Sequence, residues 1–161
     1  MKALPSGILV VAIGFLTFAA EAPQAAERAF AHFVGNWSGS GTISVKDGGR
    51  ERIRCRGNHT ESGDTLKLGL KCASDSYKFE LQSDITYESG AVSGSWNEAT
   101  RGVYGTLSGR MTSSHIEATA QSSAFNASLS ISTRGNRQSV VIKSPGSEIS
   151  EVAISLARSG R

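Results

Sequence analysis

The residues best suited to chemistry in this 161-residue chain are two cysteines and three histidines. Cys55 and Cys72 form an even pair, which predicts one disulfide bond in an exported protein. Zinc would require four ligands, and no histidine stands at ligand spacing beside this pair. His59 could ligate a metal or haem, whereas a neutral histidine hydrogen-bonded to the backbone is the more frequent arrangement. His32 and His115 lie in other segments, so the sequence predicts no metal site and no cofactor.

Catalytic signatures are missing from the sequence. It contains no Gly-x-Ser-x-Gly elbow, no His-Glu-x-x-His motif and no phosphate-binding loop. Acidic residues such as Asp75 and Asp84 fall on expected turns or outward-facing positions, away from any partner for acid–base work. The sequence therefore predicts a protein that is not an enzyme.

The densest charge cluster is a row of alternating arginines followed by two lysines. Alternate residues of a strand share one face, so these side chains are expected together on one outer face. The six cations of this basic face are Arg50, Arg52, Arg54, Arg56, Lys67 and Lys71. Like charges opposite one another, such as Arg56 and Lys71, destabilise a sheet. This favours an anionic partner such as lipid phosphate, lipopolysaccharide or an acidic protein surface.

A second interpretation of the basic face requires no partner. Charged strands discourage edge-to-edge aggregation, and Glu80 and Asp84 on the next expected strand would balance part of the charge. Nucleic acid is not the predicted partner, because no aromatic residue is interleaved with the arginines to stack on bases. The net charge of +3 is also too small to indicate nucleic-acid binding.

The N-terminus predicts export. Lys2 is followed by an uncharged, mostly apolar run at residues 8–20 and then by small residues, the layout of a secretory signal peptide. The run is shorter than the roughly 20 residues of a membrane-spanning helix, although an uncleaved anchor remains the alternative. Pro23 disfavours cleavage at Ala22, so we expect it after Ala26. The predicted domains are a signal peptide (1–26) and a periplasmic or extracellular domain (27–161) without a transmembrane helix.

The elements that position these residues are strands and tight turns. In residues 50–72, a two-residue turn at Gly63-Asp64 places Cys55 opposite Cys72 and turns the apolar residues of both strands to the same face. A one-residue slip would break both matches. Gly63 at the first turn position suits a type II′ turn, and directly opposed cysteines lie within disulfide reach.

Alternating apolar and polar residues recur along the rest of the chain. A first strand follows a helical turn at residues 27–32, and later strands are expected at 102–111, 115–121, 125–133, 138–143 and 150–158. Turn-prone groups separate them, and no segment has a helical period. The prediction is an all-β, single up-and-down antiparallel barrel of 8–10 strands, with a two-sheet sandwich as the alternative.

Small inward residues in the later strands oppose aromatic residues in the earlier ones. The small positions are Gly105, Gly109, Ala118, Ala120 and Ala127. Either the aromatics fill this space, or a cavity remains for a small apolar or amphipathic ligand. The candidate cavity residues are Trp37, Tyr77, Phe79, Tyr87, Trp96 and His59.

The segment Phe33-Val34-Gly35-Asn36-Trp37 resembles the start of calycin-type barrels, the lipocalins and fatty-acid-binding proteins. In lipocalins this tryptophan plugs the closed end of the barrel beneath an arginine near the last strand. The resemblance implies that Arg158 takes that part here. Other lipocalin signatures, including the Thr-Asp-Tyr segment, are missing.

Most of residues 27–161 also resembles small secreted β-barrel proteins of alphaproteobacteria. The segments that carry this resemblance are residues 70–79, 93–98 and 133–140. The resemblance implies export and a barrel, and it implies no particular activity.

Overall fold

The structure is a computed structural model that describes residues 28–160. Within this range ten antiparallel strands follow one another and close into one barrel, which confirms the predicted fold over the sandwich. The strands are β1 (Gly35–Val45), β2 (Arg50–Ser62), β3 (Thr65–Ala73), β4 (Lys78–Glu88), β5 (Ala91–Glu98), β6 (Val103–Thr112), β7 (His115–Gln121), β8 (Asn126–Arg134), β9 (Arg137–Lys143) and β10 (Ile149–Arg158). The predicted signal peptide (1–26) lies outside the described residues.

The β2–β3 hairpin has the predicted register. Ser62 pairs with Thr65 across the two-residue turn, and Cys55 pairs with Cys72, to which it is disulfide-bonded. Gly63 has a φ of 57°, as the first position of a type II′ turn requires. The buried residues of both strands face the barrel interior, so the turn, the disulfide and the apolar pattern specify one pairing.

The barrel closes where β1 pairs with β10. Two inward-facing glycines of β1 make this seam tight. A side chain at Gly39 would collide with the carbonyl oxygen of Ser155, and one at Gly41 with that of Ala153. The glycines therefore let the first strand coil closely against the last.

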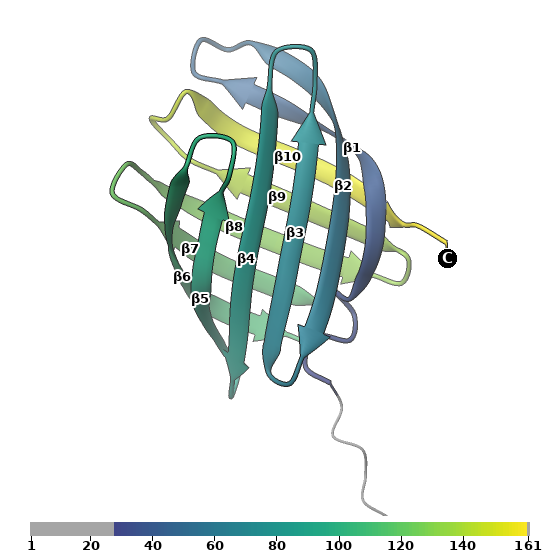
Figure 1. Cartoon of the computed structure of the whole chain (residues 1–161). Helices are drawn as coiled ribbons and strands as arrows, with labels where there is room; N and C mark the ends of the chain where they lie inside the picture. Colours follow the sequence, from purple (N-terminus) through teal and green to yellow (C-terminus); the bar gives the residue numbers. More distant parts are fainter. Residues whose placement is uncertain (1–27, 161) are drawn as a thin grey trace, which may run out of the picture.

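The two ends of the barrel are built differently. At one end, adjacent strands join through two-residue turns at 63–64, 89–90, 113–114 and 135–136. At the other end they join through loops of four or five residues at 46–49, 74–77, 99–102, 122–125 and 144–148, which gather toward the top and left of Figure 1. We call these the closed end and the mouth.

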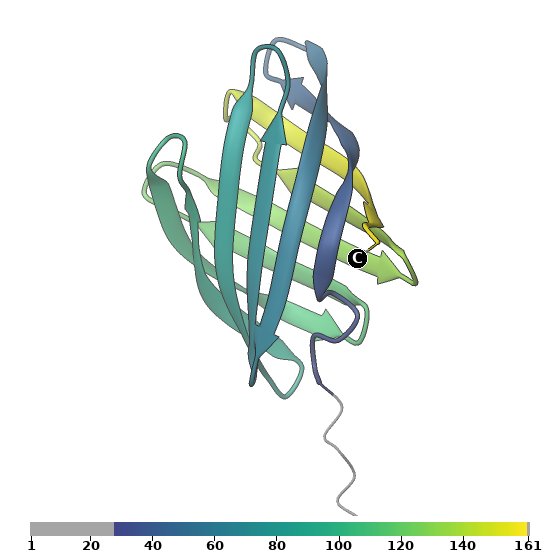
Figure 2. The same cartoon turned by 45° about the vertical axis from the view of Figure 1, so that its right-hand side comes forward.

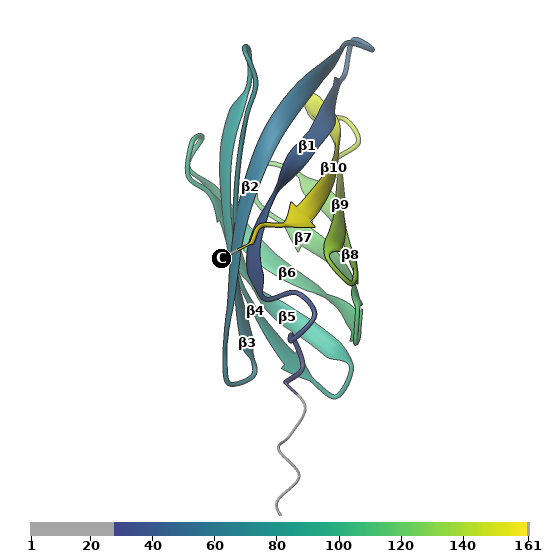
Figure 3. The same ribbon diagram turned by 90° about the vertical axis from the view of Figure 1, so that its right-hand side faces the viewer.

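The barrel is flattened. Figure 3 shows β2–β4 in one wall and β8–β10 in the opposite wall, and Figure 1 shows the strands of the two walls crossing. Figure 2 shows the C-terminal strand β10, in yellow, beside β1. In the part of the chain that the structure describes, no helix is long and apolar enough to cross a membrane.

The residues before β1 cover the closed end. A helical turn was predicted over residues 27–32. The structure instead has consecutive turns. The amide of Ala31 donates a hydrogen bond to the carbonyl oxygen of Arg28, and the amide of Phe33 donates one to that of Phe30. Phe30 and Phe33 are buried, and their rings meet edge to face. The segment therefore acts as an apolar plug, because burying its aromatic side chains against the end of the barrel removes their apolar surface from water.

Candidate ligand-binding site

A cavity of about 290 Å³ runs from the mouth loops into the barrel as far as His59. Its walls are aliphatic and aromatic side chains from both sides of the barrel, including Leu68, Leu70, Leu107, Leu129, Ile142 and Val152. Ala120 and Ala127 also line it, because their small side chains leave space that the opposite wall does not fill. The cavity is therefore an apolar chamber that opens among the mouth loops.

The aromatic side of the cavity is held rigidly. Trp96 lies over Gly105, and its Nε1 donates a hydrogen bond to the carbonyl oxygen of Thr106 (3.1 Å). Its ring packs against Phe125, with centroids 5.8 Å apart. The one polar atom of the indole is thus satisfied by the wall, which leaves an apolar ring face toward the cavity.

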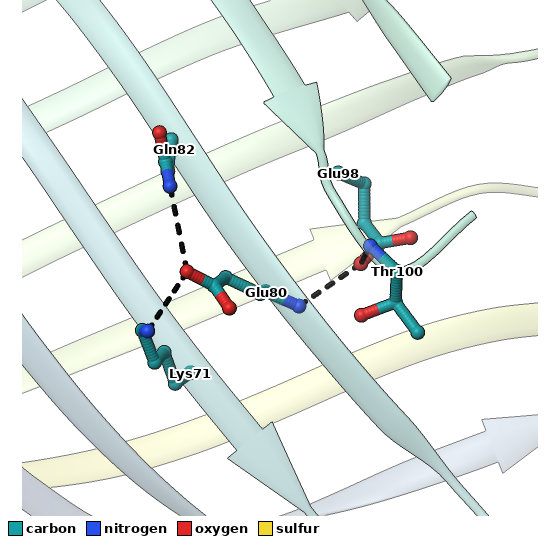
Figure 4. A network of polar contacts seen from close by, with 5 residues as sticks. All are labelled: Lys71, Glu80, Gln82, Glu98 and Thr100. Carbon is teal, nitrogen blue, oxygen red and sulfur yellow. Dashed lines mark hydrogen bonds and ion pairs between the residues drawn. The ribbon is translucent and has the colours of Figure 1, made fainter. Parts of the chain in front are cut away.

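Glu98 organises the mouth at the end of β5. Its carboxylate accepts hydrogen bonds from the backbone amides of Glu80 (2.9 Å), Thr100 (3.0 Å) and Arg101 (2.9 Å), and it pairs with the Arg101 guanidinium (3.5 Å). Partial burial raises the pKa of Glu98, but the amide hydrogen bonds outweigh it and hold the pKa below its ordinary value. Figure 4 shows this carboxylate beside the Lys71–Glu80–Gln82 contacts on the outer face. Glu98 is therefore charged and fixes the 99–102 loop.

The inner end of the cavity is bounded by His59, which begins a row of hydrogen-bonded polar side chains. His59 is 2% exposed, and its Nε2 lies 3.1 Å from Oε1 of buried Gln138. The amide nitrogen of Gln138 donates to Thr133 (3.2 Å), so its oxygen faces His59 and the neutral imidazole carries its proton on Nε2. Nδ1 is then an acceptor, and it has no hydrogen-bond partner among residues 28–160.

Burial lowers the pKa of His59 by more than the hydrogen bond with Gln138 raises it, and the nearby charge of Arg158 lowers the pKa further. His59 is therefore neutral near pH 7. The hydrogen-bond partner of His59 is the side-chain amide of Gln138, across the barrel. From the sequence, a backbone partner is expected instead. In the described range no group of three or more histidine, cysteine, aspartate or glutamate side chains is arranged to hold a metal ion.

Below His59, the closed end is sealed by Trp37 and Arg158. Trp37 is 1% exposed and donates from Nε1 to the carbonyl oxygen of Phe33 (3.0 Å). The guanidinium of Arg158 lies over the indole ring and donates to the carbonyl oxygens of Val34 and His32. This is the arrangement that the calycin resemblance implied.

The structure divides the six candidate cavity residues by their height along the barrel. His59, Phe79 and Trp96 line the cavity. Trp37 lies at the closed end, and Tyr87 packs edge to face against the plug residue Phe30. Tyr77 precedes β4 and is partly buried against the core. The last three are not among the residues that line the cavity.

Sequence reasoning missed the polar groups that position the site. Glu61 has a side chain that is only 2% exposed and accepts a hydrogen bond from the amide of Phe30 (2.9 Å), which anchors the plug. It continues the inward alternation of β2, so the pattern could have found it. Gln138 also occupies an inward position, but its contact with His59 joins residues from opposite walls, which no local pattern indicates.

The basic face lies outside the barrel, away from the cavity. All six side chains are exposed. Lys71 is paired with Glu80 (2.9 Å) and Lys67 with Asp84 (3.8 Å). The four arginines of β2 make no ion pair with any residue in the described part of the chain. The expected acidic neighbours therefore balance the lysines and leave the arginine row uncompensated.

Strand order, closure and the plugged end define the fold as a calycin-type β-barrel. The chain is similar to two solved structures of that shape. Rv2717c from M. tuberculosis has a TM-score of 0.66 at 14% identity, over 82% of this chain and 96% of the other. The S-type phycobiliprotein lyase CPES from Guillardia theta has a TM-score of 0.56 at 9% identity, over 82% of this chain and 91% of the other. The sequence matches no protein-family model and no curated protein.

Proposed function

We propose that the protein is a non-enzymatic, exported barrel that binds a small apolar or amphipathic ligand in its cavity. The observation that carries the proposal is the apolar chamber of about 290 Å³ that opens at the mouth. This volume is close to the lower bound of roughly 300–1,000 Å³ for ligand pockets, so the ligand is small. Unfilled apolar space forfeits dispersion contacts, and an apolar ligand would restore them.

The mouth determines how an amphipathic ligand would lie. Arg101, Glu148 and the Ser144–Ser147 hydroxyl pair belong to the mouth side of the lining. The ligand's polar end would meet these groups and remain hydrated, while its apolar end would reach toward Phe79 and Trp96. An anionic end would compete with Glu98 for the Arg101 guanidinium.

Export is part of the proposal. The Cys55–Cys72 disulfide is consistent with an oxidising compartment. The expected signal peptide (1–26) and the resemblance to secreted alphaproteobacterial barrels favour the periplasm or the extracellular space. One structural neighbour is named a lyase, but at 9% identity the likeness extends to the fold alone.

Ligand titrations test the proposal directly. Straight-chain alcohols and carboxylic acids of increasing length are expected to raise the melting temperature of the wild-type protein. Trp96 lines the cavity, so its fluorescence should change on binding, and this change should disappear in Trp96→Phe while the thermal shift remains.

Cavity-filling variants provide the matched comparison. Ala127→Leu and Ala120→Leu add the same side-chain atoms inside the cavity, whereas Ala157→Leu adds them at an exposed position on β10. We expect the first two to bind each ligand more weakly and the third to bind as the wild type does. Equal binding by all three, or no thermal shift of the wild type with any ligand, would refute the proposal.

A further inference from the structure

The exposed face that runs from β10 across β1 to β2 combines two rows of unlike side chains. The outward residues of β2 here are arginines, and their direct cross-strand partners on β1 all carry hydroxyl groups. The pairs are Arg50 with Ser44, Arg52 with Thr42, Arg54 with Ser40 and Arg56 with Ser38. The hydroxyl side chains are short, so the long arginines stand beside a shallow polar floor.

The next strand continues this floor. Ala153, Ser155 and Ala157 of β10 pair with the hydroxyl row, and their side chains are small. On the other side of β2 lies β3, where outward-facing Gly69 has no side chain and Ala73 has a short one. A shallow groove therefore lies there beside Arg54 and Arg56. The surface is therefore an open trough with cations along one edge.

The arginines form a linear array. Successive arginines lie two residues apart on one strand, which places them about 6.6–6.8 Å from each other. None of them has an ion-pair partner among residues 28–160, whereas the neighbouring lysines are paired. A row of uncompensated, fork-shaped donors matches an extended chain of carboxylate, sulfate or phosphate groups.

The side chains of this face distinguish between classes of anionic partner. The only large hydrophobic side chain that is well exposed in the described residues is Tyr104, which lies on β6. The face therefore offers no apolar group to insert into a bilayer and no aromatic anchor for a protein interface. Hydroxyl groups beside cations instead suit a partner that carries both charge and hydroxyls.

We propose that the arginine row of β2 and the hydroxyl row of β1 form a binding surface for a linear anionic polysaccharide. The arginines bind its acidic groups, and the hydroxyls of β1 bind its sugar hydroxyls. This surface is on the outside of the barrel and functions whether or not the cavity is occupied.

Binding to immobilised polygalacturonate and heparin tests the proposal, with dextran as the neutral polysaccharide. The wild type is expected to bind both polyanions, more weakly as salt is raised, and not dextran. Arg52→Thr with Arg54→Thr should lower the affinity about tenfold. Arg134→Thr with Arg137→Thr removes the same charge from exposed positions at the closed end and should leave the affinity unchanged.

Two further comparisons separate the outcomes. Thr42→Val with Ser40→Ala removes hydroxyls without changing charge, and it should weaken polysaccharide binding. Vesicles of phosphatidylcholine and phosphatidylglycerol serve as the membrane comparison. The proposal fails if the wild type binds neither polyanion, if both arginine pairs weaken binding equally, if the hydroxyl variant binds as the wild type does, or if the vesicles bind more tightly than the polysaccharides. Circular dichroism of each variant verifies that the barrel is intact.

Discussion

Arg158, the last residue of β10, stacks on Trp37 near the start of β1, with its guanidinium carbon 4.2 Å from the centre of the indole ring. The same guanidinium donates to the carbonyl oxygens of Val34 and His32. One side chain thus joins the last strand, the first strand and the plug at the closed end.

Replacing Arg158 should loosen this end. Arg158→Ala removes a cation–π contact and two hydrogen bonds, so we expect the free energy of unfolding to fall by about 1–3 kcal/mol. Arg158→Lys keeps the charge but loses the planar guanidinium. Its free energy of unfolding should therefore lie between those of the wild type and Arg158→Ala. Urea unfolding followed by tryptophan fluorescence measures the change. Arg134→Ala, an exposed arginine, is the control, and equal midpoints for both alanine variants would contradict the prediction.

The disulfide should stabilise the barrel through its loop. Cys55 and Cys72 are 17 residues apart in sequence, and cross-linking a loop of that length contributes roughly 3 kcal/mol in the chain-entropy account. Cys55→Ala with Cys72→Ala is expected to unfold at a lower urea concentration than the oxidised wild type. Adding a reductant should lower the midpoint of the wild type only. A midpoint that does not respond in either protein would show that the disulfide contributes little.

His59 should make stability depend on pH. Burial lowers its pKa below the ordinary value of 6.5, so on acidification the unfolded chain takes up a proton before the folded protein does. The free energy of unfolding should therefore fall as the pH drops from about 7.5 to about 5.5. His59→Gln cannot be protonated, and its unfolding curves should show a smaller fall over the same range. An identical pH dependence in both proteins would argue against this role.

Glu98 should stabilise the mouth at neutral pH and lose this effect in acid. Its pKa is held below the ordinary value of 4.5, so its contribution is present above that value and disappears as the pH falls through the folded pKa. Glu98→Gln should lower the free energy of unfolding by about 1–3 kcal/mol at neutral pH. Glu88→Gln, at an exposed position, is the matched control. Chemical denaturation at neutral and acidic pH measures both, and an equal loss in the two variants would count against the assignment.

Much of the barrel was predictable because strand alternation and turn chemistry are local. The pairing of Ser62 with Thr65 follows from Gly63, and that of Tyr87 with Val92 from the Ser89-Gly90 turn. Each pairing fixes which residues face inward. The strands after residue 102 also lie close to where alternation placed them.

The height of each inward residue along the barrel was not predictable in this way. Alternation separates inside from outside, but the tilt and stagger of the strands decide which residues share a level. Phe79 and Tyr87 both face inward from β4, yet one lines the cavity and the other packs against the plug. Contacts between opposite walls, such as that of His59 with Gln138, depend on the same geometry.

The seam between β1 and β10 brings both ends of the barrel's chain to the closed end, opposite the mouth. A tether joined to the barrel at residue 28 or residue 160 would meet it at the closed end, on the side opposite the mouth loops. A barrel tethered at either of these residues would thus present its cavity away from the point of attachment. Short linkage of the two ends, with new termini in the 99–102 loop, should preserve every strand pairing in a circular permutant.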